Sequence, residues 1–349
     1  MDNSDSLRED LEGLIDRLPT LPHSKWISRA LSTIIKLAEE DVDRLDWKIL
    51  SASIEDMRQA FQIFYDYRHV RKIAVFGSAR TPDDQVEYQM ARQFAQQATK
   101  QGFMVITGAG GGIMEAANQG AGKELSFGLN IRLPYEQDAN SFIEDDPKLM
   151  RFKYFFTRKL FFLRESDAIA LFPGGFGTHD EALECLTLCQ TGRHAPIPMI
   201  LIDKPGGSYW QDWDAYIRKN LVANQLISAE DTSLYTMTDN LEEAYEQICN
   251  FYLMYHSSRY VKELLVIRLK QDINEVELDL LNQKFADILA SGKITCTKAL
   301  EEEVGDPTEH LPRLLLHFNQ RDSGRLYQMI QMINRMGAGL GCNFQPQTK

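Results

Sequence analysis

The chain has 349 residues, of which 44% are hydrophobic and 25% charged, a composition typical of globular proteins with an apolar core. This length favours about two to three domains. The 50 acidic residues outnumber the 38 basic ones and give a formal net charge of −12. This balance argues against nucleic-acid and membrane-surface binding, because both need a broad positive field, whereas one small anion needs only a local site.

Residues 1–69 are predicted to form a helical extension, because apolar residues recur there at helical spacing. Pro19 and Pro22 separate the first helix from the second. The acidic first residues contain no apolar signal segment, and no run reaches the ~18 apolar residues that cross a bilayer, so we expect a cytoplasmic protein. We expect the extension to pack on the central domain or on a partner subunit. Its helical repeats are Leu7–Leu18, Trp26–Ile35 and Ile54–Phe64.

Residues 70–255 are predicted to form a Rossmann-like α/β domain, because short apolar runs alternate there with amphipathic segments of helical length. This alternation indicates a doubly wound fold, in which helices cover both faces of a parallel sheet and the ligand binds at the carboxyl ends of the strands. The expected strands are Ile73–Phe76, Phe103–Thr107, Phe127–Ile131, Ala168–Phe172 and Met199–Ile202, and the expected helices are Asp83–Gln101, Ile113–Lys123, Thr157–Ser166 and Thr178–Gln190.

Residues 256–349 are predicted to form a small α+β accessory domain with the order βαββα. The segment contains no recognisable catalytic cluster, and we expect a role in oligomerisation or regulation. The expected strands are Glu263–Leu269, Ile294–Ala299 and Arg313–Phe318, and the expected helices are Glu275–Leu289 and Ser323–Met336, followed by a glycine-rich tail.

The cysteines and histidines give no sign of a metal or disulfide site. The five cysteines show neither zinc-ligand nor C-x-x-C spacing, which fits a reducing compartment. Cys185 and Cys189, four residues apart on an expected helix, are interpreted as two small buried side chains rather than a redox pair. His179 and His194 are interpreted as exposed polar residues.

Three strands of the central domain end in loops of small residues, Gly77–Arg80, Gly108–Gly112 and Pro173–Thr178. Glycine at such a turn allows a positive φ and lets a ligand approach the backbone, and a helix N-terminus behind it offers free N–H groups. A single loop of this kind is explained by a tight turn alone, but three at one sheet edge favour a phosphate site. The candidate binding residues in the first two loops are Ser78, Gly110, Gly111 and Gly112.

Comparison with common phosphate-binding motifs narrows the ligand to a mononucleotide. A P-loop needs Lys and then Ser or Thr after its last glycine, and neither glycine-rich loop has them. The dinucleotide motif G-x-G-x-x-G fits Gly108 and Gly110 but has Ile113 at its third glycine position. No acidic residue closes the next strand, where Asn130 and Arg132 stand. ATP hydrolysis and NAD chemistry are therefore disfavoured.

Two further segments each allow a structural and a functional interpretation. Arg158 and Lys159 begin an expected apolar helix, so they can be exposed snorkelling cations or a rigid clamp for phosphate, sugar or base. Thr178 and Glu181 fit a T-x-x-E capping box, which explains both residues structurally. Alternatively, Glu181 lies beside the glycine loop, where its carboxylate can bind ribose hydroxyls, stabilise a cationic sugar and orient water.

Together these segments resemble the Lonely Guy (LOG) family, long labelled lysine decarboxylase-like and marked by PGGxGTxxE. The resemblance rests on VITGAGGGIMEAANQGA at Val105–Ala121, FFTRK at Phe155–Lys159 and PGGFGTHDE at Pro173–Glu181. The second loop departs from the more frequent Gly-Gly-Gly-Pro-Gly but keeps the glycine cradle. The flanking segments are similar to longer bacterial relatives and are absent from the short plant enzymes.

The resemblance implies a phosphoribohydrolase that cleaves nucleoside 5′-monophosphates to free base and ribose 5-phosphate. The family's substrates are AMP and, in cytokinin activation, N6-modified adenine nucleotides. The resemblance also implies that Arg158 and Glu181 are the catalytic pair, that no cofactor or metal takes part, and that the protein is a homodimer or higher homo-oligomer. The substrate-binding residues it implies are Glu136, Lys159, Gly174, Gly175, Phe176, Gly177, Thr178 and Thr187.

Two other functions stay open on the sequence. A non-catalytic carrier of a nucleotide or of molybdenum cofactor shares the glycine loops but does not need both Arg158 and Glu181. A decarboxylase needs pyridoxal phosphate on a lysine beside a histidine, and the chain has no S-x-H-K run. Release of free base from AMP would separate the hydrolase from both alternatives.

Overall fold

The computed structural model describes Gly13 and residues 21–132 and 138–337. Residue contacts divide the chain into two units, Met1–Glu55 and Asp56–Lys349. Among the described residues, no helix is both long and apolar enough to span a bilayer.

The described part of the first unit is helical. Helix α2 spans Ser24–Glu39 and precedes α3, Arg44–Tyr65, whose last turns belong to the second unit. The repeats predicted over Trp26–Ile35 and Ile54–Phe64 lie within these helices. The helix predicted over Leu7–Leu18 lies outside the described residues.

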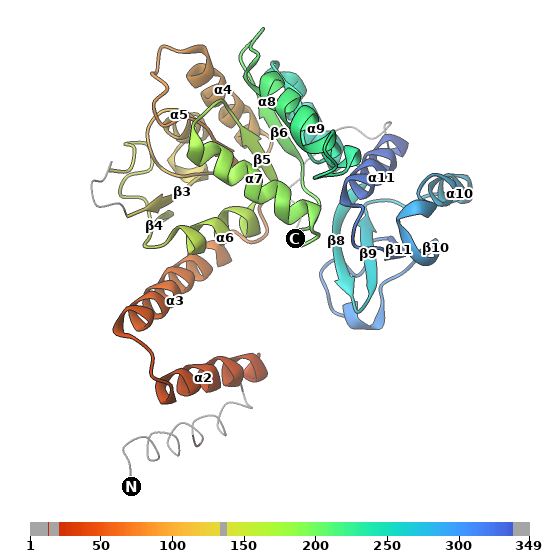
Figure 1. Cartoon of the computed structure of the whole chain (residues 1–349), viewed down its shortest axis with the longest axis horizontal. Helices are drawn as coiled ribbons and strands as arrows, with labels where there is room; N and C mark the ends of the chain where they lie inside the picture. The colour runs from red at the N-terminus through yellow and green to blue at the C-terminus, as the bar shows by residue number, and fades with distance from the viewer. Residues whose placement is uncertain (1–12, 14–20, 133–137, 338–349) are drawn as a thin grey trace. The chain divides into compact units, whose positions relative to one another are not determined.

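A seven-stranded parallel sheet with the order β4-β3-β2-β1-β5-β6-β7 forms the centre of the second unit (Figure 1). In the middle strand, Ile73 pairs with Val105 of β2 on one side and with Ala168 of β5 on the other. The predicted doubly wound α/β fold is confirmed. The strands are β1 Lys72–Phe76, β2 Met104–Thr107, β3 Ser126–Ile131, β4 Leu149–Phe152, β5 Ala168–Leu171, β6 Met199–Ile202 and β7 Thr236–Thr238.

Helices cover both faces of this sheet. Alternate residues of a strand point to opposite faces, so each strand contributes to the core on either side. In β1, Ile73 and Val75 pack with α4, α5 and α9, whereas Ala74 and Phe76 belong to the core that includes α6 and α7. Every residue of β1 is buried, and after Lys72 the strand is an uninterrupted apolar run, Ile73–Phe76. The helices are α4 Val86–Lys100, α5 Ile113–Ala121, α6 Phe155–Glu165, α7 Phe176–Gln190, α8 Tyr209–Ile217 and α9 Leu241–Phe251, with short helical turns at Lys123–Leu125, Arg218–Val222 and Ala229–Leu234.

The two edge strands, β4 and β7, escape prediction from the sequence pattern. Only Met150 and Phe152 are buried in β4, and only Thr238 is buried in β7. A strand at the edge of the sheet has one neighbour and is less completely covered, so it lacks the continuous apolar run by which the inner strands were identified.

A second sheet of four antiparallel strands, in the order β10-β11-β9-β8, follows the large one. It has one strand more than predicted, because β8 is polar in its middle and therefore lacks the apolar run that identifies the other strands. The predicted helix over Glu275–Leu289 ends at Lys284, and the next strand begins at Leu289. The elements are β8 Tyr255–Val261, β9 Leu264–Leu269, α10 Glu275–Lys284, β10 Leu289–Thr297, β11 Arg313–Phe318 and α11 Ser323–Met336, with 3-10 turns at Ala286–Ile288 and Glu301–Glu303.

Helix α11 joins the small sheet to the large one. The Tyr327 hydroxyl accepts from the Ile197 N–H at 3.0 Å and donates to the Ile197 carbonyl at 3.1 Å, just before β6. The Asn334 side chain accepts from the N–H groups of Met254 and Tyr255, each at 2.9 Å. Apolar residues of both sheets consequently share one core.

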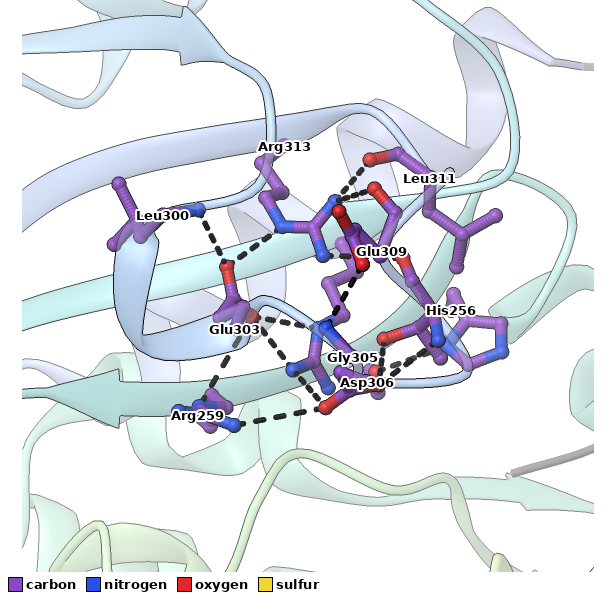
Figure 2. Close-up of polar contacts among 12 residues, drawn as sticks. His256, Arg259, Leu300, Glu303, Gly305, Asp306, Glu309, Leu311 and Arg313 are labelled. Carbon is purple, nitrogen blue, oxygen red and sulfur yellow. Dashed lines mark hydrogen bonds and ion pairs between the residues drawn. The ribbon is translucent and has the colours of Figure 1, made fainter.

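A buried charge network fastens the segment after β10 to the small sheet (Figure 2). The Glu303 carboxylate, fully buried, lies 2.6 Å from Arg268 Nη2 and 2.7 Å from Arg313 Nε. Arg268 also lies 3.1 Å from the Asp306 carboxylate, and Arg259 of β8 lies 3.6 Å from the same group. The network therefore ties β8, β9 and β11 to one connecting segment.

Candidate active site

Three loops meet at the carboxyl edge of the large sheet, on either side of β1. The chain winds outward from β1 in opposite directions, which is the point where doubly wound folds bind ligands. The Ser78 N–H donates to the Pro173 carbonyl at 3.1 Å, and the Ile113 N–H donates to the Ser78 carbonyl at 3.0 Å. The backbone of Ser78 thus holds the loops after β1, β2 and β5 together.

Buried side chains fix the second loop. The Thr107 hydroxyl donates to Asn118 Oδ1 at 2.7 Å and accepts from the Ala109 N–H at 3.0 Å. The Asn140 amide donates to the Gly110 carbonyl at 3.0 Å. Ala109 is held at a φ of 59°, an uncommon conformation for a residue with a side chain. These contacts preorganise the loop before any ligand arrives.

The glycines of the loops serve two different purposes. Gly112 has a φ of +61°, and a Cβ there would collide with the Ser78 carbonyl. A Cβ at Gly174 would lie 2.9 Å from the Ser78 nitrogen and would collide with Thr178. Gly175 and Gly177 instead face open space. The first pair therefore allows the loops to pack, and the second pair leaves room for a ligand.

A cleft of about 820 Å³ opens between these loops and the first turns of α6 and α7. Its floor is formed by backbone of the three loops, and its side walls carry one arginine from α6 and one glutamate from α7. The residues that line it are Phe76, Gly77, Ser78, Ala79, Arg80, Gly108, Met114, Arg158, Phe162, Gly174, Gly175, Phe176, Gly177, Thr178, His179 and Glu181.

Helix α7 begins inside the third loop, at Phe176, two residues before the predicted start. Its N-cap is Gly175, and no side chain caps it, so the predicted capping box of Thr178 and Glu181 is wrong. Thr178 is instead buried against Gly174. Among the described residues, the N–H groups of Phe176 and Gly177 have no hydrogen-bond acceptor. The helix therefore presents free donors and its positive dipole end to the cleft.

Helix α6 brings Arg158 to the opposite wall. Arg158 Nη2 lies 3.6 Å from Glu181 Oε1, and the guanidinium carbon lies 4.9 Å from the Phe155 ring and 5.6 Å from the Phe162 ring. Arg158 Nε is buried without a hydrogen-bond partner among the described residues. The interpretation of Arg158 as an exposed snorkelling cation is therefore wrong, because aromatic rings and the Glu181 carboxylate hold its side chain in the cleft.

Asp56 at the second unit's start positions the N-terminus of α6. Its carboxylate accepts from the N–H groups of Lys153 and Tyr154, at 3.0 and 3.4 Å, and from the Thr157 hydroxyl at 2.8 Å. A carboxylate at this end of a helix satisfies free donors and opposes the positive dipole end. The extension in which the sequence revealed no chemistry therefore supports the helix that carries Arg158.

Burial dominates the electrostatics of the cleft. It raises the pKa of Glu181 to about 7, although Lys159 and Arg158 both lower it and Glu184 raises it further. Burial likewise lowers the pKa of Arg158. Burial alone would lower the pKa of Lys159, but its hydrogen bonds to Glu184 and Asp180 raise it above the usual value. The Glu181 carboxyl therefore changes charge near neutral pH.

Comparison with known proteins finds relatives of the central part of the chain. The family model described as "Possible lysine decarboxylase" matches residues 97–248. The chain is 30% identical over 156 residues to the probable cytokinin riboside 5′-monophosphate phosphoribohydrolase LOGL5 of Oryza sativa subsp. japonica, and 27% identical over 139 residues to the cytokinin riboside 5′-monophosphate phosphoribohydrolase LOG2 of Arabidopsis thaliana. These matches support membership of the Lonely Guy (LOG) family.

The LOG resemblance covers part of each protein. The two plant alignments include 43% and 38% of this chain and span 60% and 63% of the relatives' own lengths. Among solved structures, the molybdenum cofactor binding protein of Rippkaea orientalis is 19% identical with a TM-score of 0.36, and covers 51% of this chain and 95% of its own. The molybdenum cofactor carrier protein of Chlamydomonas reinhardtii is 18% identical with a TM-score of 0.35, and covers 51% and 98%.

Several of the residues predicted to bind substrate lie away from the cleft lining. Gly110, Gly111 and Gly112 belong to the fixed second loop but are absent from the lining. Lys159 turns toward the acidic side chains of α7, 2.7 Å from Glu184 and 2.9 Å from Asp180. Thr187 is exposed, and its hydroxyl donates to the Leu183 carbonyl within α7. Glu136 lies outside the described residues. Ser78, Arg158, Glu181 and the segment Gly174–Thr178 line the cleft as expected.

His179, at a position that the LOG motif leaves unspecified, lines the cleft, so its interpretation as an exposed residue is wrong. The Tyr209 hydroxyl donates to the Gly174 carbonyl and lies 2.7 Å from His179 Nε2. The hydroxyl proton is thus already used, and Nε2 must donate to the tyrosine oxygen, which leaves Nδ1 as an acceptor. Burial lowers the pKa of His179, which fits a neutral ring. The sequence signal for this arrangement is weak, because Tyr209 lies 30 residues away.

Proposed function

We propose that this cleft hydrolyses the N-glycosidic bond of nucleoside 5′-monophosphates, with AMP-like substrates, and releases free base and ribose 5-phosphate. The observation that carries the proposal is the convergence of Arg158 and Glu181 on one cleft beside the unfilled donors of α7. The LOG relatives named as phosphoribohydrolases support the same reaction class.

The phosphate would bind at the N-terminus of α7. The free N–H groups of Phe176 and Gly177 and the helix dipole supply donors and positive potential. The absence of side chains at Gly175 and Gly177 lets an anion reach the backbone. Binding energy gained at the phosphate can then be used for distortion at the sugar, which the reaction requires.

Glu181 would act on the ribose. Glycosidic bonds break through an oxocarbenium-like sugar, and a buried carboxylate stabilises that cation strongly because the surrounding dielectric is low. The ionised Glu181 would also bind the ribose hydroxyls and orient water toward C1′. Arg158, whose Nε lacks a partner, would orient the nucleotide and neutralise charge at the phosphate or the departing base.

A panel of nucleoside 5′-monophosphates tests the proposal when free base is separated and quantified by chromatography. We expect release of base from AMP or a close analogue and a far lower kcat/KM for adenosine, which lacks the phosphate anchor. Equal turnover of AMP and adenosine would contradict the phosphate role. Tight binding of AMP without release of base from any nucleotide would instead favour a carrier.

We further propose a cytoplasmic homodimer or larger homo-oligomer. Several large apolar side chains of α6 and α7 are exposed. Apolar residues that cluster on the surface often mark a protein–protein interface, so we expect the interface on these helices. Light scattering coupled to gel filtration measures the assembly, and a monomer at micromolar concentration would contradict it. The exposed residues are Phe155, Phe156, Leu160 and Leu183.

A further inference from the structure

Helix α7 carries a second group of reactive side chains at the end far from Glu181. Cys189, near its last turn, is only 5% exposed and lines a cavity of about 200 Å³. The cavity lies where α7, the segment 192–196, β8 and α11 come together. Polar residues on its walls include His194, Ser258, Arg259 and Tyr327.

Backbone geometry fixes the protonation state of His194. Its Nδ1 lies 2.7 Å from the Ala195 carbonyl oxygen, and its Nε2 lies 3.0 Å from the Leu163 carbonyl oxygen. A carbonyl can only accept, and a neutral imidazole has a single N–H to donate. Both bonds form together only when the ring is protonated. Burial lowers the pKa of His194, but the charge of Cys189 and these two backbone hydrogen bonds raise it, so that it lies above its usual value overall.

This imidazolium and the Cys189 thiol line the same cavity. A hydrogen bond from the Cys185 thiol, one turn earlier, lowers the pKa of Cys189 most, and the charge of His194 lowers it further against the effect of burial. A cysteine paired with a protonated histidine is a thiolate at neutral pH, and the thiolate is the nucleophilic form. The other groups that face Cys189 are Arg193 and Arg259 on the cavity wall and Tyr255 of β8.

The Cys189 cavity has a rigid far wall. Arg259 extends from β8 and is held by the carboxylates of Asp306 and Glu303, at 3.6 and 4.0 Å (Figure 2). These ion pairs keep the arginine in place, and the volume of the cavity admits only small molecules. A neutral oxidant such as hydrogen peroxide is small enough to enter a space of about 200 Å³.

We propose that Cys189, paired with His194, is a modification site that reacts with small peroxides. The thiolate sulfur attacks one peroxide oxygen and the O–O bond breaks. The departing hydroxide takes a proton from the His194 imidazolium, so the products from hydrogen peroxide are cysteine sulfenic acid, water and neutral His194. The new oxygen lies in the packed junction of α7 and α11. Oxidation of Cys189 therefore changes the contact between α11, which packs on the small sheet, and α7, the helix that carries Glu181.

The full-length protein contains its own reference thiols. Cys249 on α9 is buried, and Cys296 on β10 is exposed with a pKa that burial raises. The protein is treated with hydrogen peroxide between about pH 6 and pH 8, quenched, denatured and labelled for sulfenic acid, and each cysteine is quantified by peptide mass spectrometry. The same series is run on His194→Gln and on Cys185→Ser, and circular dichroism and melting curves check that each variant is folded.

We expect Cys189 to oxidise fastest and to lose less than about threefold in rate between pH 8 and pH 6, whereas an ordinary thiol such as Cys296 loses on the order of 100-fold. His194→Gln should slow Cys189 at least about tenfold near pH 6 and give it the steep profile of an ordinary thiol. Oxidation of Cys189 no faster than that of Cys249, or an unchanged profile in folded His194→Gln, would overturn the proposal. If His194→Gln does not fold, thiolate absorbance of the wild type near 240 nm between about pH 5 and pH 9, compared with Cys189→Ser, decides the same question.

Discussion

Glu181 lies 3.6 Å from the Arg158 guanidinium, and yet burial raises the pKa of its carboxyl group to about 7. The pair is therefore unlike an ordinary surface ion pair, in which the carboxylate is charged well below neutral pH. Two nearby cations are not enough to offset the loss of water around the carboxylate. A carboxyl group with a pKa near neutral pH is typical of residues that take part in catalysis, because a small change in its environment, such as substrate binding, changes its charge.

The acid limb of the pH profile should follow Glu181. If the ionised carboxylate is the active form, kcat/KM for AMP falls about tenfold per pH unit below pH 7. Glu184 raises the pKa of Glu181 and also binds Lys159, so Glu184→Gln should move the acid limb to lower pH. Lys159→Gln removes a cation that lowers the same pKa and should move it to higher pH. Initial rates with AMP across about pH 5 to pH 9 measure all three proteins.

Opposite shifts in these two variants are what identifies Glu181 as the titrating group. The comparison uses the shape of each profile and not the absolute rate, because Lys159→Gln can also change substrate binding. Identical midpoints in wild type, Glu184→Gln and Lys159→Gln would assign the acid limb to another group.

Substitution of Glu181 separates catalysis from helix stability. Glu181→Gln should lower kcat on AMP by about 10³-fold while AMP still binds, as measured by calorimetry. The folded-state pKa of about 7 lies above the ordinary 4.5, so ionised Glu181 costs stability above about pH 7 and this cost vanishes below about pH 4.5. The melting temperature of Glu181→Gln should thus equal or exceed that of wild type at about pH 8, with a smaller difference near pH 5. A uniform loss of melting temperature with unchanged kcat would indicate a structural role instead.

The inner strands of the large sheet and the position of its ligand edge were predictable, because a strand buried on both faces is almost wholly apolar, as β1 is from Ile73 to Phe76. The edge strands were not, since burial of only Met150 and Phe152 in β4 leaves no such run. The capping box failed for a related reason. Nothing local decides whether α7 starts at Phe176 or Thr178, and the packing of Gly174 and Thr178 against Ser78 decides it.

Residues far apart in sequence explain the other gaps in prediction. Asp56 fixes the helix of Arg158 from about a hundred residues away, and His179 is held by Tyr209. Neither partner is marked by a motif, because a carboxylate that caps a helix in space has no fixed spacing from it. Only tertiary structure brings such pairs together.

Two glycines of the third loop should respond oppositely to alanine. A Cβ at Gly177 meets no atom within 4 Å, so Gly177→Ala should fold normally and place a methyl group where the phosphate approaches. We expect KM for AMP to rise at least about tenfold with little change in melting temperature. Gly174→Ala should instead lower the melting temperature, because its Cβ lies 2.9 Å from the Ser78 nitrogen. A normal KM in Gly177→Ala would place the phosphate elsewhere.

Asp56 should affect turnover without touching substrate. Asp56→Ala removes the acceptor for Lys153 N–H, Tyr154 N–H and the Thr157 hydroxyl, which should cost about 1–2 kcal/mol of unfolding free energy. Because α6 then frays where Arg158 is held, kcat/KM for AMP should fall about tenfold or more. Thr157→Val removes only one of the three bonds and should give a smaller effect of the same sign. Urea unfolding and AMP kinetics on both variants check this order, and full activity in destabilised Asp56→Ala would contradict it.

Two neighbouring glutamates after β10 allow a matched test of burial in the charge network. Glu303→Gln leaves Arg268 and Arg313 with a neutral amide in a fully buried place, and the loss of one partner of a buried pair costs about 3–5 kcal/mol. Glu302 pairs at 2.6 Å with Lys262, whose side chain is 81% exposed, so Glu302→Gln should leave the unfolding free energy almost unchanged. Both substitutions remove one negative charge from the same turn, so general electrostatics cannot explain a difference between them. Equal unfolding free energies of the two variants in urea would mean that the network around Glu303 does not stabilise the small sheet.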